Sequence, residues 1–336
     1  MCSQLRLVAC VSGIYIAFLT WSLVYEPLTT QIWPHSQAKF QAPCVVALVQ
    51  ASVAAMTGTL YLKQQRTEHR AREFLRNYIR DLLAISLTQS LSTPLAAYSL
   101  QYVDFLTYML AKSCKLIPIL VVHLLLYHTR IANDKKLVAI AVTFGVVLFN
   151  LGSQKSSNKT STKDVSLIHG FLPLLVSLLL DGFTNATQDT LLKRNRAQKK
   201  QKLITGGHLM LGLNFGIVIW NLLYLAIIDP QQAIRTRAMI SLDPIIALYL
   251  LTYAVCGALG QICIFYTLQN YGSLVLVMVT VTRKMTSMIL SIIVYGHHVS
   301  TLQWFGISIV FAGISSEALI KSRTSAKAKV EAEKSE

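Results

Sequence analysis

Charge is scarce in this chain. Only 14% of its 336 residues are Asp, Glu, Lys or Arg, and the acidic residues number 15 against 31 basic ones. This composition, with 53% hydrophobic residues and a mean hydropathy of +0.50, excludes an ordinary soluble protein and is typical of a polytopic membrane protein. The net charge of +16 then fits basic cytosolic loops and an anionic ligand, and no nucleic-acid partner is expected.

Motifs for metal binding and catalysis are also missing. The six cysteines lie in or beside apolar runs and form no CxxC or Cys/His pattern, so we expect neither disulfides nor a metal site. There is no HExxH, no GxGD and no cluster of carboxylates, which argues against a membrane enzyme acting on lipid-linked sugars. We therefore assign no catalytic residue and no cofactor. The first apolar run has no small-x-small cleavage site and is interpreted as a retained helix.

Apolar runs long enough to cross a bilayer fill most of the sequence. A spanning helix needs about 20 apolar residues. The sequence therefore predicts an all-α membrane protein with ten transmembrane helices, at 5–25, 43–62, 81–100, 104–127, 136–153, 166–187, 204–228, 244–268, 272–295 and 301–320. The connections at 100–104 and 268–272 are very short.

The basic residues predict the orientation of these helices. If both termini lie in the cytosol, the cytosolic segments hold 21 Lys and Arg residues and the opposite side holds 6. This bias obeys the positive-inside rule and predicts that both ends are cytosolic. The remaining four basic residues fall inside predicted helices: Lys112, Lys115, Arg283 and Lys284.

A polar segment at 154–165 divides the chain into two sets of five helices. The expected units are a first repeat at 1–153, a lumenal linker at 154–165, a second repeat at 166–320 and a cytosolic polar tail at 321–336. The linker contains an acceptor sequon at Asn158, which is a candidate for glycosylation.

The two halves show weak internal similarity. The segment Tyr98-Ser-Leu-Gln matches Tyr266-Thr-Leu-Gln at an offset of 168 residues, and the same offset pairs Lys115 with Arg283. Two glycines in the fifth predicted helix, at 145 and 152, match two in the tenth, at 306 and 313. Because five is an odd number, the second half enters the membrane upside down. This is the inverted repeat of many secondary transporters, whose sites lie near the midplane.

The intramembrane basic residues are the strongest site candidates. Lys115 and Arg283 each lie 11 residues past the start of a predicted helix, from opposite faces of the membrane. At about 1.5 Å per residue, both reach ~16 Å, roughly the middle of a ~30 Å core. Snorkelling falls short of the nearest interface for all of the four except Lys112, and Asp181 and Glu317 are the carboxylates available for internal pairing. The surplus of cations favours an anionic ligand.

Polar and aromatic residues in the helices could add specificity. Amide side chains suit a base or a sugar and tyrosines suit stacking on a base, whereas helix–helix hydrogen bonding is the alternative for each of them. The candidate substrate-binding residues are Tyr108, Lys112, Lys115, Gln188, Gln261, Tyr266, Arg283 and Lys284.

Four segments resemble a known family. WSLVYEP at 21–27, LTYMLAKSCK at 106–115, LDGFTNATQD at 180–189 and GSLVL with TRK within 272–284 resemble the nucleotide-sugar transporters of the B subfamily of solute carrier family 35, in the drug/metabolite transporter superfamily. The resemblance covers nearly the whole chain and is closest to fungal UDP-galactose transporter homologues of the endoplasmic reticulum.

The resemblance implies ten helices and exchange of a cytosolic nucleotide sugar for a lumenal nucleoside monophosphate. The expected pair is UDP-galactose, with UDP-glucose as an alternative sugar, and UMP. The family's nucleotide-binding region maps onto Lys112, Lys115, Arg283 and Lys284. The chain ends in Glu-Lys-Ser-Glu, with one lysine of a dilysine retrieval signal, so location in the endoplasmic reticulum membrane rests on the resemblance.

The expected mechanism is alternating access. An empty site would leave several buried cations unpaired, which favours return with an anion and hence exchange. The alternative transport function is ATP/ADP exchange across the same membrane, for which the same cations would serve. A structural or chaperone-like membrane protein would not need cations at the midplane.

Overall fold

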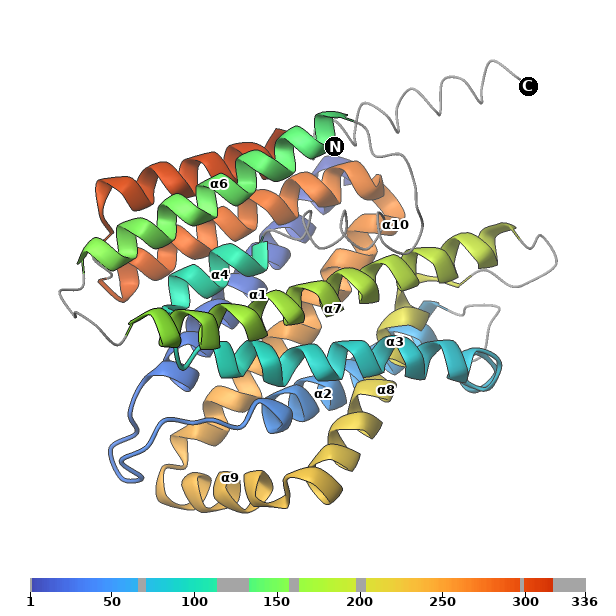
Figure 1. Cartoon of the computed structure of the whole chain (residues 1–336). Helices are drawn as coiled ribbons and strands as arrows, with labels where there is room; N and C mark the ends of the chain where they lie inside the picture. Colours follow the sequence, from blue (N-terminus) through green and yellow to red (C-terminus); the bar gives the residue numbers. More distant parts are fainter. Residues whose placement is uncertain are drawn as a thin grey trace.

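The computed structural model describes residues 2–65, 71–113, 133–156, 163–197, 204–296 and 299–316, and helices account for nearly all of them (Figure 1). This confirms the predicted all-α class. The helices are α1 (Cys2–Thr30), α2 (Pro43–Gln65), α3 (Ala71–Ser99), α4 (Phe105–Ser113), α6 (Asn133–Ser156), α7 (Lys163–Ala197), α8 (Gly206–Leu223) with the π-helical segment η1 (Tyr224–Ile228), α9 (Pro230–Leu242), α10 (Ile245–Val294) and a last helix, Thr301–Ser316.

The outer surface of the helix bundle is apolar. On α6, the exposed side chains Leu137, Ile140, Phe144 and Val147 follow one face of the helix. Such a continuous apolar surface is suited to lipid rather than water. Four described segments are also long and apolar enough to span a membrane: Arg6–Thr30, Pro43–Gln64, Gly206–Ile228 and Ile245–Thr267. The fold is that of a polytopic membrane protein.

The first limb of α10 runs antiparallel to α1. A Cβ atom placed on Gly13 would lie 3.1 Å from the sulfur of Cys263. Further along α1, the ring of Trp21 stacks on Tyr253 with 4.9 Å between the ring centroids. As residue numbers rise along α1, the numbers of their partners on α10 fall, so the two segments point in opposite directions.

The second limb of α10 runs parallel to α1. The hydroxyl of Tyr15 donates a hydrogen bond to Thr282 Oγ1 at 2.7 Å, and Ser291 Oγ donates to Glu26 Oε2 at 2.5 Å. Here the residue numbers on both segments rise together. Because α1 packs against both limbs in opposite senses, α10 folds back on itself, and this reversal is visible in Figure 1.

The reversal corrects one detail of the sequence prediction. We expected separate helices at 244–268 and 272–295, and the structure has two limbs but no break in helical backbone between them. Continuous helical hydrogen bonding satisfies the peptide groups at the bend, so a polar loop is not required.

Other boundaries also differ from the prediction. The segment between the seventh and eighth predicted helices contains α9, which begins where Asp229 accepts a hydrogen bond from the amide of Gln232 at 3.1 Å and Pro230 occupies the first turn. A search for apolar runs overlooks this helix because it is polar. The helices α3 and α7 likewise extend past the predicted 81–100 and 166–187, since apolar runs mark only the membrane core.

A side chain at the end of α10 replaces a backbone hydrogen bond that a proline removes from α1. Pro27 has no amide hydrogen, so the carbonyl oxygen of Leu23 loses its usual helical donor. The hydroxyl of Tyr295 donates a hydrogen bond to this oxygen at 2.5 Å. The motif around Pro27 is therefore held by a contact with the second limb of α10.

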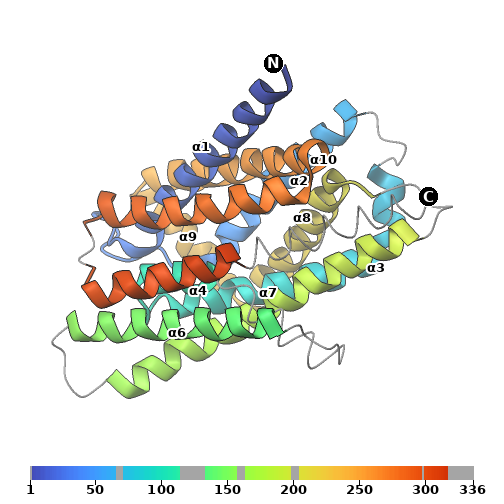
Figure 2. The ribbon, with the colours of Figure 1, turned by 90° about the horizontal axis from the view of Figure 1, so that it is seen from above.

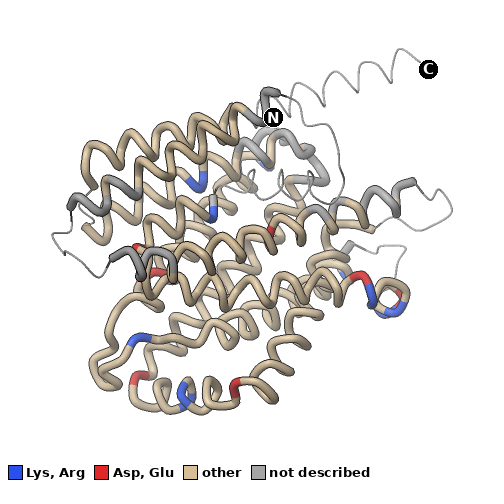
Figure 3. The backbone as a smooth tube through the Cα atoms, in the orientation of Figure 1, with Lys and Arg blue, Asp and Glu red and all other residues tan. Residues whose placement is uncertain are grey.

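Polar contacts join the helices at both ends of the bundle. At one end, Asn195 donates to the Tyr78 hydroxyl at 3.1 Å and accepts from the amide of Ile204 at 3.0 Å. At the other end, His35 Nδ1 lies 2.8 Å from Asp243 Oδ1. Most charged positions among the described residues lie near the ends of the bundle, and few lie in its interior (Figure 3). Seen from above, α6 and α7 lie towards one edge and α1 towards the opposite edge (Figure 2).

Candidate functional site

A cavity of about 390 Å³ lies inside the bundle. Its wall takes residues from α1, α2, α3, α4, α7, α8 and both limbs of α10. Small-molecule sites in proteins have volumes of about 300–1,000 Å³, so the cavity can hold a small ligand. Segments that are far apart in the sequence therefore meet at one place.

The cavity brings together five of the eight predicted substrate-binding residues. Its lining includes Tyr108, Lys112, Gln261, Arg283 and Lys284.

Three further candidates have different outcomes. Gln188 on α7 and Tyr266 on α10 are half-buried and do not line the cavity. Lys115 lies outside the described residues, as does the sequon at Asn158.

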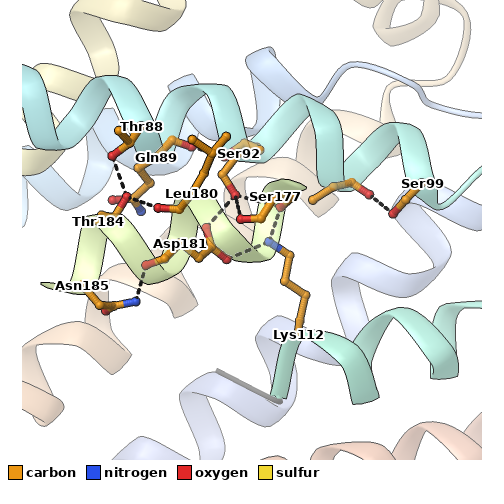
Figure 4. A network of polar contacts seen from close by, with 12 residues as sticks. Thr88, Gln89, Ser92, Ser99, Lys112, Ser177, Leu180, Asp181, Thr184 and Asn185 are labelled. Carbon is orange, nitrogen blue, oxygen red and sulfur yellow. Dashed lines mark hydrogen bonds and ion pairs between the residues drawn. The ribbon is translucent and has the colours of Figure 1, made fainter. Parts of the chain in front are cut away.

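Lys112 is held by α7. Its Nζ donates hydrogen bonds to Asp181 Oδ2 at 2.8 Å and to Ser177 Oγ at 2.7 Å (Figure 4). The side chains of Lys112 and Asp181 are 20% and 22% exposed, so the ion pair borders the cavity and is not sealed inside protein. Internal pairing, which the sequence left open as an alternative, therefore occurs for Lys112.

Helix α3 completes this polar network. Ser92 Oγ donates to Asp181 Oδ1 at 2.6 Å and lies 2.8 Å from Ser177 Oγ. Thr88 lies one turn before Ser92 on α3, and Thr184 lies one turn after Asp181 on α7. The hydroxyls of these two threonines are 2.6 Å apart. Asp181 is thereby fixed from two sides, with one carboxylate oxygen accepting from a hydroxyl and the other from an ammonium group (Figure 4).

Arg283 has a different environment. Its guanidinium carbon lies 4.4 Å from the centre of the Phe18 ring, which is a cation–π contact. Its Nε is buried and has no hydrogen-bond partner in the described part of the chain. Buried donors are normally satisfied, so this Nε, on a residue that lines the cavity, is a candidate donor to the acceptor of a bound ligand. The adjacent Lys284 lines the same cavity.

An aromatic cluster forms another part of the wall. The rings of Trp21, Tyr25 and Tyr253 are stacked, with centroid distances of 4.9 Å for Trp21–Tyr253, 5.3 Å for Tyr25–Tyr253 and 5.9 Å for Trp21–Tyr25. Our sequence reasoning did not assign these residues to the site. The available signal was the spacing of Trp21 and Tyr25, which are four residues apart and share one face of α1.

A second cavity, of about 650 Å³, adjoins the first. Tyr25, Pro43 and Val46 line both cavities. The second cavity also has Lys39 and Asp229 in its wall, and these residues lie in the connections at one end of the bundle. The central cavity is therefore adjoined on this side by a space that reaches the end of the bundle.

Sequence comparison identifies the family. The profile of the UAA transporter family matches residues 6–321. The chain belongs to the UAA transporter family. This membership indicates a transporter, in agreement with the resemblance carried by the four sequence segments, and it places the cavity inside a transport protein.

Relatives are similar over nearly their full length. A protein of Saccharomyces cerevisiae is 53% identical over 328 residues, which cover 96% of each chain, and one of Kluyveromyces lactis is 53% identical over 321 residues, which cover 94% of this chain and 93% of the relative. A Candida glabrata protein is 50% identical over 350 residues, covering 97% of each. All three are named UDP-galactose transporter homolog 1.

One solved crystal structure has a similar fold. It aligns with 94% of this chain and 99% of its own chain, with a TM-score of 0.53 and 10% sequence identity. At this identity the likeness concerns the fold alone.

Proposed function

We propose that this protein is a nucleotide-sugar transporter that carries UDP-galactose from the cytosol into the lumen of the endoplasmic reticulum and returns UMP. The names of the relatives support UDP-galactose as the substrate. The observation that carries the proposal is the central cavity, where cations from α4 and α10 line the same space as a stacked aromatic cluster. A nucleotide sugar needs both kinds of surface.

The cations suit the diphosphate group. Arg283 offers a planar set of donors that matches phosphate oxygens. Its buried Nε, which has no hydrogen-bond partner among the described residues, can donate to one of these oxygens. Lys284 and Lys112 add positive charge at the same cavity. Lys115, the predicted counterpart of Arg283, joins them in the proposal on the sequence pattern alone.

The remaining lining suits the base and the sugar. The aromatic cluster of Trp21, Tyr25 and Tyr253 lines the cavity together with Tyr108 and provides apolar aromatic surface for uracil. Amide groups that can hydrogen-bond a base or a sugar line the cavity on α2, α3, α8 and α10, and they belong to Gln50, Gln89, Asn214 and Gln261.

Paired helix contacts support a repeat of five plus five helices, with units at 1–153 and 166–320. In this repeat α1, α2 and α3 correspond to α7, α8 and the first limb of α10. The packing of α1 on α10 then has its counterpart in the packing of α7 on α3, and α2 packs directly on its own counterpart, α8.

Glycine contacts between α6 and the last helix support the same repeat. A Cβ atom on Gly145 would lie 2.8 Å from Val310 Cγ2, and one on Gly306 would lie 3.0 Å from the Cβ of Phe149. The shift of 161 residues that relates Gly145 to Gly306 also relates Phe149 to Val310. The two contacts are therefore equivalent under one rotation, as an inverted repeat requires.

Transport would follow from rocking of one repeat against the other. With both termini cytosolic, as the basic residues predict, the second cavity lies on the lumenal side and gives the central cavity its exit. The opposite movement would open the centre to the cytosol.

A competition series tests the substrate. The purified full-length chain is reconstituted in liposomes preloaded with UMP, and uptake of labelled UDP-galactose is measured against excess unlabelled UDP-galactose, UDP-glucose, UMP or ATP. We expect UDP-galactose and UMP to suppress uptake by at least about tenfold and ATP to have little effect. Absence of UDP-galactose uptake, together with uptake of labelled ATP against ADP, would overturn the proposal in favour of nucleotide exchange.

A further inference from the structure

The central cavity neutralises one of its cations internally. Lys112 donates to Asp181 at 2.8 Å, and the same carboxylate accepts from Ser92 at 2.6 Å. Both partners of the ion pair line the cavity with about a fifth of each side chain exposed. Arg283 lines the same space and has no ion pair with a carboxylate in the described residues. A bound anion would therefore meet an engaged cation at Lys112 and, at Arg283, a cation that has no ion pair among the described residues.

Asp181 presents its oxygens much as a phosphate group would. One oxygen accepts from an ammonium group and the other from a hydroxyl, and a second hydroxyl, of Ser177, lies within hydrogen-bond distance of both donors. Lysine and serine donors of this kind are also what a phosphate oxygen needs. The carboxylate thus occupies the donors that an incoming anion would use.

We propose that Asp181 is an internal counter-ion that engages Lys112 while the cavity is empty and competes with the phosphate groups of the nucleotide for it. This rests on the proposed function, because it assigns a role within the same site. A buried cation without a partner is strongly unfavourable, and Asp181 removes that penalty from the empty protein. The entering nucleotide must displace the carboxylate, which lowers its affinity and helps it to leave.

The competition is reciprocal. If the carboxylate weakens anion binding at Lys112 by some factor, a bound anion weakens the Lys112–Asp181 pair by the same factor. Ser92 belongs to α3 and Asp181 to α7, so displacement of the carboxylate would alter the contact between helices of the two predicted repeats. Asp181 is therefore a positioning and affinity-setting residue and not a passive packing contact.

Binding to the purified full-length protein in detergent tests the proposal. The probes are UMP and inorganic pyrophosphate, measured by calorimetry for the wild type and for Asp181→Asn. Because the amide has no charge to hold Lys112, we expect Asp181→Asn to bind both probes about tenfold more tightly. The matched control is Asp81→Asn, which removes an exposed carboxylate of α3 and should leave both affinities unchanged. Equal or weaker binding by a folded Asp181→Asn protein would overturn the proposal.

A double variant provides a second test of the competition if Asp181→Asn alone does not fold. Lys112→Gln leaves Asp181 without its cation and should weaken UMP binding, whereas Lys112→Gln with Asp181→Asn removes both charges and avoids an unpaired ion. We expect the double variant to bind UMP more tightly than Lys112→Gln. Weaker binding by the double variant would contradict competition by the carboxylate.

The two probes separate this proposal from the proposed function. If Asp181→Asn gains affinity for pyrophosphate but no form of the protein binds UMP or transports UDP-galactose, the counter-ion stands and the nucleotide-sugar assignment fails. If the wild type transports UDP-galactose and Asp181→Asn gains no affinity for either probe, the transport assignment stands and the counter-ion fails.

Discussion

Lys112 and Arg283 both place a positive charge in the wall of the cavity, but the protein stabilises the two charges in different ways. Lys112 donates hydrogen bonds to a hydroxyl and a carboxylate of α7, and Ser92 of α3 donates to the same carboxylate. Arg283 lies against the Phe18 ring, with a buried Nε that has no described partner. An ion pair satisfies a cation fully, whereas an aromatic face stabilises it only partly and leaves its hydrogen-bond donors free. We therefore expect an entering anion to bind Arg283 before it displaces the partner of Lys112.

The largest expected effect comes from removing that contact. Arg283→Ala should lower UDP-galactose uptake by about 100-fold or more, because a charge-assisted pair in a low-dielectric cavity is lost. Uptake is measured in proteoliposomes at equal protein content. Arg235→Ala on α9 removes an exposed arginine and should transport normally. Near-normal uptake by Arg283→Ala would show that Arg283 does not bind the substrate and would contradict its assigned role.

Removing Lys112 should have a smaller effect on transport and a distinct effect on stability. Lys112→Ala leaves Asp181 without its cation, which should lower the free energy of unfolding by about 2 kcal/mol. A second substitution, Asp181→Ala, should return most of that stability, because the unpaired charge is gone. Thermal unfolding in detergent compares the single and double variants. If the double variant unfolds at a lower temperature than the single variant, the ion pair is not the source of the effect.

Weakening the aromatic contact should change affinity only a few-fold. Phe18→Leu keeps the apolar volume near Arg283 but removes the ring face, a loss of about 1 kcal/mol at a partly desolvated cation. We expect UMP affinity to change by less than about tenfold, and Phe18→Tyr, which keeps a ring, to stay near the wild type. An effect as large as that of Arg283→Ala would mean that Phe18 contacts the ligand directly.

A hydrogen-bonded carboxylate outside the cavity, Asp243, provides the reference for a purely structural role. Burial raises the pKa of Asp243, but hydrogen bonds from the His35 ring and from the backbone amides of Ser36 and His35 outweigh burial and lower this pKa to about 2. Since the folded pKa is below the ordinary value of 3.8, the stabilisation is present above that value and is lost as the pH falls through about 2.

Asp243→Asn should therefore unfold at a lower temperature than the wild type at neutral pH. The difference should shrink as the pH is lowered from 3.8 towards 2. Binding of UMP at neutral pH should not change, because Asp243 does not line the central cavity. Thermal unfolding across this pH range checks the first expectation. A stability difference that persists unchanged at the lowest pH would contradict it.

The intramembrane cations could be predicted because charge is so rare in the apolar runs. Arg283, Lys284 and Lys112 stood out for this reason, and all three line the cavity. The aromatic wall could not be predicted in the same way, since Trp21 and Tyr253 are ordinary residues of membrane helices. The sequence offered Asp181 and Glu317 as carboxylates for internal pairing, but only the geometry shows that Asp181 pairs with Lys112.

The fold shows a similar division. Apolar runs located the four described segments that are long and apolar enough to span a membrane, because hydrophobic length is a direct physical requirement of the bilayer. They overlooked α9, which is polar, and they predicted a break in α10 where helical hydrogen bonding continues through the bend. Both differences arise from tertiary contacts and local capping, which a count of apolar residues does not contain.

Exchange across a sealed membrane tests the central claim most directly. Uptake of labelled UDP-galactose is measured in liposomes that contain the wild-type protein and are either empty or preloaded with UMP. Because Arg283 in an empty cavity lacks a described anionic partner, we predict uptake at least about tenfold faster with UMP inside. Equal rates in empty and preloaded liposomes would contradict the claim that the cavity reopens to the cytosol only when an anion is bound.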